Sequence, residues 1–171
     1  PEESALRRSA RTWVGPVLVL GFFMLVCVLR WRQHFANVDD YLYALQTNAF
    51  LHSLSAGPKG VLAAWREYGT NAPLVPMVAL PLALISVSPH ALVLVQVGFL
   101  AVLLISCREI LRDVGFTKDG SLLGASLITA LPPVMGYAGL YHFAVASAAC
   151  TALAAAGYLR SEQLTRRAPS I

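Results

Sequence analysis

Residues 120–159 read GSLLGASLITALPPVMGYAGLYHFAVASAACTALAAAGYL and contain no Lys, Arg, Asp or Glu. The run is long enough for two membrane-spanning helices of roughly 20 residues each. It divides at the four residues 139–142, GLYH, which predicts spans over residues 121–138 and 143–159. Pro132 and Pro133 lie inside the first of these spans and are expected to kink it or to unwind its outer end.

The composition of the whole chain favours a lipid environment. Of its 171 residues, 57% are hydrophobic and 13% are charged, whereas a soluble domain carries about 25% charged residues. This balance excludes an ordinary soluble globule, and it excludes disorder, which needs the opposite composition. The net charge of +4 comes from basic residues scattered between apolar blocks, so no nucleic-acid partner is expected. Cys27, Cys107 and Cys150 lie in apolar blocks without C-x-x-C spacing, which indicates neither a disulfide framework nor a zinc site.

Two further apolar blocks precede this run. Residues 13–29 follow three arginines and end at Arg30-Trp31-Arg32, which is typical of an uncleaved signal-anchor with its N-terminus inside. Residues 68–107 again lack charge, and residues 90–107 form a good span. The segment 72–88 is also apolar, but it is interrupted by prolines, so it predicts either a fifth span or a segment that lies in the interface or re-enters.

The positions of the basic residues decide between these two topologies. If residues 72–88 span, the six basic residues after residue 107 fall outside, against only three inside. If they do not span, all nine lie inside: Arg7, Arg8, Arg11, Arg108, Arg112, Lys118, Arg160, Arg166 and Arg167. We therefore predict an all-α, polytopic membrane module over residues 1–171, with both ends cytoplasmic. Its four transmembrane helices are at about 13–29, 90–107, 121–138 and 143–159.

The first outer loop, residues 30–89, is expected to hold short helices at the membrane surface. Apolar residues over 41–54 have the spacing of an amphipathic helix lying on the outer face. A second short helix is predicted over 61–67, followed by the apolar segment 72–88.

Asp39 and Asp40 are the most informative pair in that loop. Two adjacent carboxylates before a membrane-lying helix are costly unless they are paired or functional. One of them can act as a general base. The alternative is a helix N-cap, in which an Asp side chain accepts from free N–H groups, and the two roles are compatible.

The stretch Asn37-Val38-Asp39-Asp40-Tyr41-Leu42-Tyr43, after one span, resembles the opening of GT-C fold glycosyltransferases. This polyprenyl-phosphate-sugar family includes protein O-mannosyltransferases and the aminoarabinose transferases of lipid A, whose first outer loop carries an acidic pair followed by an aromatic helix. Residues 68–76, YGTNAPLVP, are similar to a Tyr-Pro-Leu-Pro stretch of the family, and residues 132–137, PPVMGY, match a later family helix in kind. The chain departs from the family in its second outer loop, where residues 139–142 carry no acidic residue.

The resemblance implies an inverting transfer of a sugar from a polyprenyl-phosphate donor to an acceptor hydroxyl of unknown identity. Asp39 would take the acceptor proton, and Asp40 would orient it, bind the acceptor or support the loop; spacing alone does not choose between them. The remaining candidates for binding phosphate, sugar or acceptor are Arg30, Arg32, His34, Lys59, Trp65, Arg66, Tyr137 and His142. Interfacial snorkelling of the basic side chains and structural roles for the others are the competing interpretations. No metal and no cofactor are expected.

The chain begins with Pro1, and four spans are few for such an enzyme, so we expect an N-terminal fragment that is inactive alone. Its localisation would be the bacterial plasma membrane. The alternative is a non-catalytic accessory or lipid-binding subunit. Small residues over 144–157 would allow another subunit, or missing C-terminal spans, to pack closely.

Overall fold

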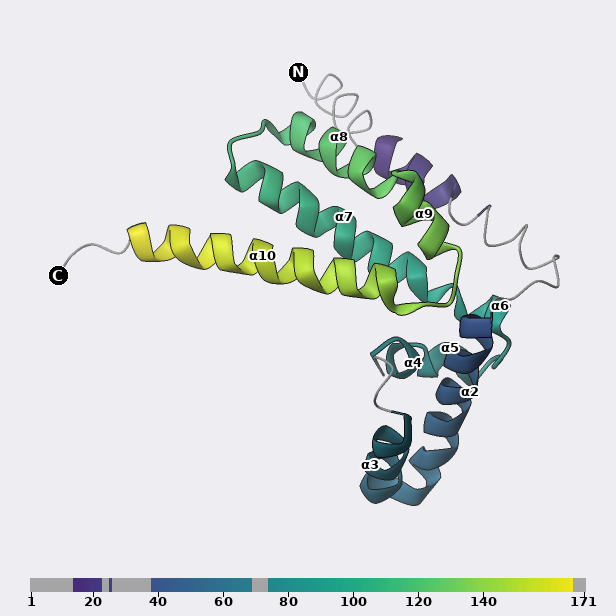
Figure 1. Cartoon of the computed structure of the whole chain (residues 1–171). Helices are drawn as coiled ribbons and strands as arrows, with labels where there is room; N and C mark the ends of the chain where they lie inside the picture. Colours follow the sequence, from purple (N-terminus) through teal and green to yellow (C-terminus); the bar gives the residue numbers. More distant parts are fainter. Residues whose placement is uncertain (1–13, 23–24, 26–37, 69–73, 168–171) are drawn as a thin grey trace, which may run out of the picture.

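The structure is a computed structural model that describes residues 14–22, 25, 38–68 and 74–167. Residues 14–22 are helical. The described chain then forms helices joined by short turns, with no strand among the described residues, which confirms the predicted all-α class (Figure 1). They are α2 (Val38–Ser53), the 3-10 helix η1 (Leu54–Ala56), α3 (Gly57–Tyr68), α4 (Leu74–Val78), α5 (Leu80–Ala83), α6 (Pro89–Leu92), α7 (Val95–Asp113), α8 (Lys118–Thr129), α9 (Pro132–Ala138) and α10 (Phe143–Arg167).

Helices α7, α8 and α10 form the bundle at the centre of the molecule, with α7 between the other two (Figure 1). Leucines and Phe99 of α7 pack against small residues of α10, including Val145, Ala146 and Ala149, all of which are buried. Small side chains let the two helix axes approach closely. The helical residues 14–22 lie against α8, since a Cβ on Gly15 would come 3.1 Å from the Ser126 hydroxyl oxygen.

The predicted span 121–138 is a bent pair of helices. α8 and α9 meet at an angle of 62° across a short break. The bend falls at Pro132, which lacks the N–H needed to continue the helix and instead begins α9. The expected proline kink is therefore confirmed.

By length and composition, one helix of the described chain, Phe143–Glu162, could cross a membrane, and the bent α8–α9 pair would add a second if it counts as one span. α7 is 19 residues long but carries four charged residues at its C-terminal end. The predicted span 13–29 lies partly outside the described residues. Four spans thus remain a prediction.

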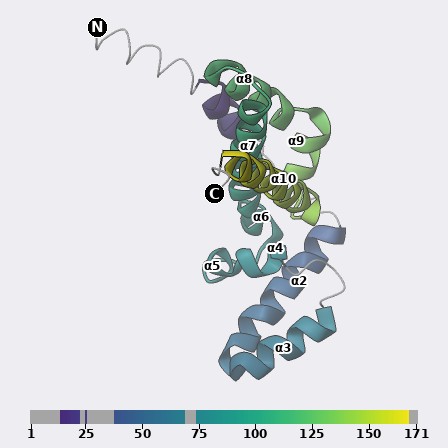
Figure 2. The same cartoon turned by 90° about the vertical axis from the view of Figure 1, so that its left-hand side faces the viewer.

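Helices α2 to α5 project from the end of the bundle where α10 begins, and Figure 2 shows the same arrangement from a second side. α2 begins at Val38, three residues before the predicted start at 41, so Asp39 and Asp40 lie inside its first turn. The chain then reverses through η1 and Gly57, whose φ of 70° favours glycine. α3 is longer than the predicted 61–67. The segment 72–88 contains the two short helices α4 and α5, and its residues 72–73 lie outside the described chain.

Candidate functional site

The N-terminal end of α2 contacts the turn between α9 and α10, which brings the two predicted outer loops together. The Tyr141 backbone N–H donates to Asp40 Oδ1 at 2.7 Å, across 101 positions of sequence. Asp40 is 6% exposed. A short, buried hydrogen bond from a backbone N–H to a carboxylate is among the stronger protein hydrogen bonds, so Asp40 fixes the position of the turn.

The Tyr141 side chain makes a second connection to α2. Its ring is fully buried, and its hydroxyl lies 2.7 Å from Thr47 Oγ1. Thr47 donates its one hydroxyl proton to the Tyr43 carbonyl at 2.8 Å, so Tyr141 is the donor to Thr47. Burial raises the pKa of Tyr141 far above its ordinary value. The tyrosine is therefore held neutral.

α7 holds the same turn from the other side. The Gln96 side chain is fully buried, and its Nε2 donates to the carbonyls of Leu140 at 3.0 Å and His142 at 2.6 Å. Sequence reasoning did not assign a role to Gln96, Thr47 or Tyr141. A lone amide in an apolar helix was the available signal for Gln96, because a buried polar group must find partners.

Asp39 lies one residue before Asp40 but faces a different side of α2. Its side chain is 52% exposed, and its Oδ2 lies 3.9 Å from His142 Nε2. His142 Nδ1 accepts from the Ala144 backbone N–H at 3.2 Å, so the proton of the neutral ring is on Nε2, facing Asp39. Asp39 thus combines an accessible carboxylate with a neighbouring donor from the second outer loop.

Aromatic rings surround this pair. The His142 ring centroid lies 4.3 Å from that of Phe143, 5.7 Å from that of Tyr43 and 5.8 Å from that of Tyr137. Burial, and secondarily the charge of Asp39, raise the pKa of Tyr43. Tyr137 is 50% exposed and Phe143 is 38% exposed. We call this group the Asp39 patch: Asp39, Tyr137, His142 and Phe143, together with the buried Tyr43 beneath them.

The structure separates the other described candidates from the Asp39 patch. Lys59, Trp65 and Arg66 lie on α3, which follows α2 in the chain and packs against its C-terminal part. α2 has 16 residues and is therefore about 24 Å long, so Lys59 in the first turn of α3 is far from Asp39 at the other end. Tyr137 and His142 do join Asp39. The predicted candidates Arg30, Arg32 and His34 lie outside the described residues.

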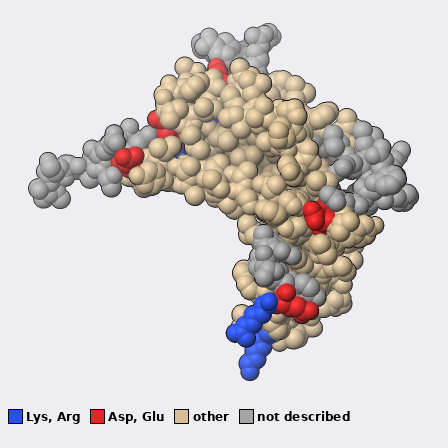
Figure 3. Space-filling view, viewed as in Figure 1, with Lys and Arg blue, Asp and Glu red and all other residues tan. Residues whose placement is uncertain are grey.

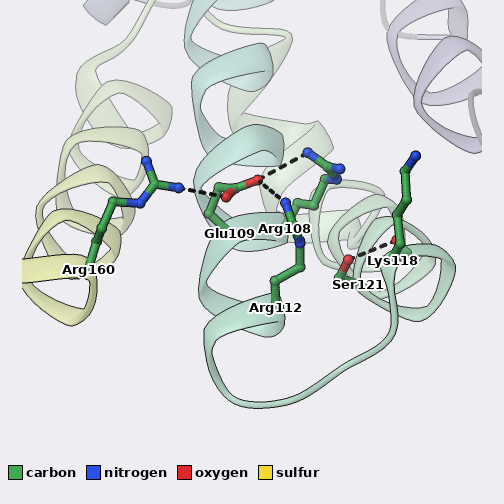
Figure 4. A network of polar contacts seen from close by, with 6 residues as sticks. All are labelled: Arg108, Glu109, Arg112, Lys118, Ser121 and Arg160. Carbon is green, nitrogen blue, oxygen red and sulfur yellow. Dashed lines mark hydrogen bonds and ion pairs between the residues drawn. The ribbon is translucent and has the colours of Figure 1, made fainter. Parts of the chain in front are cut away.

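A second polar cluster lies at the opposite end of the bundle (Figure 4). Glu109 accepts from Arg160 Nη2 at 2.8 Å and from Arg108 Nη1 at 3.0 Å, and lies 3.5 Å from Arg112 Nη1. This cluster joins α7 to α10. From Phe143 to Leu159, α10 carries no charge over a length of about 25 Å, so the polar groups gather at the two ends of an apolar bundle.

Among the described residues, no three His, Cys, Asp or Glu side chains gather as a metal-binding group. Comparison with known protein families, with characterised proteins and with solved structures gives no match. The chemistry of the site therefore has to follow from its geometry.

Proposed function

We propose that this chain is the N-terminal module of an integral-membrane glycosyltransferase. It would move a sugar from a polyprenyl-phosphate donor to an acceptor hydroxyl on the outer face of the membrane. The observation that supports this best is the division between the two acids. Asp40 is buried on a backbone N–H, whereas Asp39 remains accessible beside His142 and an aromatic surface.

In this proposal Asp39 is the general base. Its carboxylate accepts the proton of the acceptor hydroxyl while the hydroxyl oxygen attacks the anomeric carbon of the sugar. The bond between that carbon and the phosphate oxygen breaks, and its electron pair leaves with the polyprenyl phosphate. Attack from the face opposite the leaving group inverts the anomeric centre. Exposed rings such as Tyr137 offer an apolar surface to the sugar, and Asp40 positions Asp39 through α2.

The same proposal places four helices across the bilayer, with both ends in the cytoplasm. Its physical support is the apolar length of α10, which approaches the roughly 30 Å thickness of the hydrocarbon core. The arginine-rich cluster around Glu109 would then lie on the cytoplasmic side, as expected for basic residues. The Asp39 patch, at the other end of α10, would face outward.

Paired Asp-to-Asn variants separate the two acids. In membranes containing the full-length protein, we expect Asp39→Asn to lower transfer of labelled sugar from polyprenyl phosphate by about 100-fold or more, because general-base catalysis supplies about that factor. Asp40→Asn keeps an oxygen that can accept from the Tyr141 N–H, so we expect a much smaller loss of transfer.

Asp119→Asn is the matched control, because Asp119 lies exposed in the first turn of α8, away from the Asp39 patch. We expect it to retain activity. Full activity of Asp39→Asn at normal abundance, or a larger loss in Asp40→Asn than in Asp39→Asn, would contradict the assignment of the base.

A non-catalytic accessory subunit is the second candidate, and one feature of α10 favours it. Ala148, Thr151 and Ala155 are exposed along one side of this helix, which leaves room for another helix to pack closely. Ala148→Phe should then disrupt a complex, whereas Ala152 is a poorer test because it packs against the protein's own core. An intact complex in Ala148→Phe would count against this interface.

A further inference from the structure

α3 has two apolar faces, and only one of them packs against the protein. The packed face contains Gly60 and Ala64. A Cβ on Gly60 would come 2.7 Å from the Ser53 carbonyl oxygen, and Ala64 is 7% exposed. This face holds α3 against the end of α2 and needs only small residues.

The second face is larger and open. It lines an apolar groove of about 550 Å³ formed by Leu54, Gly57, Pro58, Val61, Leu62 and Trp65. Leu54 is 51% exposed, Leu62 is 52% exposed and Trp65 is 44% exposed. Such side chains in contact with water lose the free energy of burial, so the groove indicates an apolar environment on this side of α3.

The charges of α3 follow the border of this open face. At about 100° per residue, Lys59 and Arg66 both fall roughly 100° from its centre, whereas Glu67 falls on the opposite side of the helix. In Figure 3 the Lys and Arg side chains project together from the tip formed by α3. Basic residues at the edge of an apolar stripe are typical of helices lying in a membrane interface, because their stems cover apolar surface while their charges reach lipid phosphates.

We propose that α3 is an interfacial anchor whose open face lies in the headgroup layer of the outer leaflet and prefers anionic phospholipids. Charge complementarity selects this occupant, since Lys59 and Arg66 border the groove, and Trp65 is a residue type that concentrates at the headgroup level. The inner face of α2 cannot lie in the headgroup layer, because its residues Tyr43, Thr47 and Phe50 are buried against the protein. The anchor rests on the membrane placement proposed above but not on the transferase chemistry.

Tryptophan quenching tests this placement. The chain has three tryptophans, so Trp13→Phe with Trp31→Phe leaves Trp65 as the only emitter. The chain is reconstituted into nanodiscs in which the lipid carries bromine either near the headgroup or near the chain end. We expect bromine near the headgroup to quench Trp65 at least about twofold more than bromine near the chain end, and addition of phosphatidylglycerol to increase the quenching.

Matched variants identify the face. Leu62→Glu places a charge in the groove and should abolish the quenching, whereas Ala63→Glu places the same charge on the exposed polar side and should preserve it. Replacing both Lys59 and Arg66 by Gln should remove the effect of phosphatidylglycerol.

Three results would overturn the anchor. One is Trp65 emission that brominated lipids do not affect, in a chain that still resists carbonate extraction from membranes. The second is equal quenching in Leu62→Glu and Ala63→Glu. The third is Trp65 emission that changes up to saturation as farnesyl phosphate is added but does not respond to brominated lipids. That result would indicate a binding site for a single lipid molecule. In the same tryptophan background, Asp39→Asn should leave the quenching of Trp65 unchanged. A failure of the transferase proposal can therefore be distinguished from a failure of the anchor.

Discussion

At the scale of single residues, the two neighbouring carboxylates have different surroundings. Asp40 is fixed by the Tyr141 N–H, and one residue earlier Asp39 is half exposed beside His142. Successive residues on a helix point about 100° apart, so one acid can be buried in a contact while its neighbour faces outward. This arrangement makes Asp39 the better candidate for reaction with a substrate.

Tyr141 connects this site to the stability of the protein. Tyr141→Phe removes the hydrogen bond to Thr47 while keeping the ring, so we expect a loss of about 1 kcal/mol in the free energy of unfolding at neutral pH. Thermal unfolding in detergent measures it. An unchanged stability would mean that this hydrogen bond contributes nothing to the contact between α2 and the turn.

The same residue predicts a decline of stability in alkali. Burial raises the pKa of Tyr141 in the folded protein above the value near 10 of an unfolded tyrosine. Above pH 10 the unfolded chain has lost this proton and the folded chain has kept it, so stability falls as pH rises. Unfolding between pH 8 and pH 11 should show a shallower fall in Tyr141→Phe, where the raised pKa of Tyr43 still acts. Equal slopes in both proteins would contradict this explanation.

At the scale of elements, the turn between α9 and α10 is held by two separate helices. α2 supplies Asp40 and Thr47, and α7 supplies Gln96. The turn itself is short, and the His142 N–H donates to the Leu140 carbonyl within it, whereas the His142 carbonyl accepts from Gln96. The positions of Tyr137 and His142 therefore depend on helices far away in sequence.

Gln96 gives a direct test of this dependence. Gln96→Leu removes the donor of the His142 carbonyl, whereas the Leu140 carbonyl keeps the His142 N–H, and we expect a loss of roughly 2 kcal/mol in the free energy of unfolding. Ser106→Ala in the same helix is the control. Ser106 is buried, and its hydroxyl has no partner among the described residues, so the change should stay within about 0.5 kcal/mol. Similar losses in both variants would show that α7 tolerates no substitution here, rather than that Gln96 holds the turn.

The sequence predicted helices well and their contacts poorly. The long charge-free runs and Pro132 indicated α7 to α10 and the bend between α8 and α9, because hydrophobic length and missing N–H groups are local properties. The start of α2 was placed too late, since Asp39 and Asp40 were interpreted as residues before the helix. The hydrogen bond between Asp40 and Tyr141 joins residues 101 positions apart, and nothing in either local pattern specifies it.

At the scale of the whole molecule, the polar groups of the bundle divide between its two ends, apart from the charges on α3. The Asp39 patch lies where α10 begins, and the Glu109 cluster lies where α7 ends. Between them the face seen in Figure 3 is almost free of charged side chains. A bilayer crossing the bundle would separate the two clusters, and it would place Asp39 on the side where a lipid-linked sugar is presented.

The side of the membrane on which Asp39 lies is the most direct test of this arrangement. With Cys27, Cys107 and Cys150 replaced, single cysteines are introduced by Val38→Cys, next to Asp39 and 72% exposed, and by Asp119→Cys, which is also exposed. Intact cells or oriented vesicles are then treated with a membrane-impermeant maleimide. We expect Val38→Cys to react from the non-cytosolic side and Asp119→Cys to react only after permeabilisation. Reaction of both cysteines from the same side would contradict the proposed orientation and remove the basis for Asp39 as an outward-facing base.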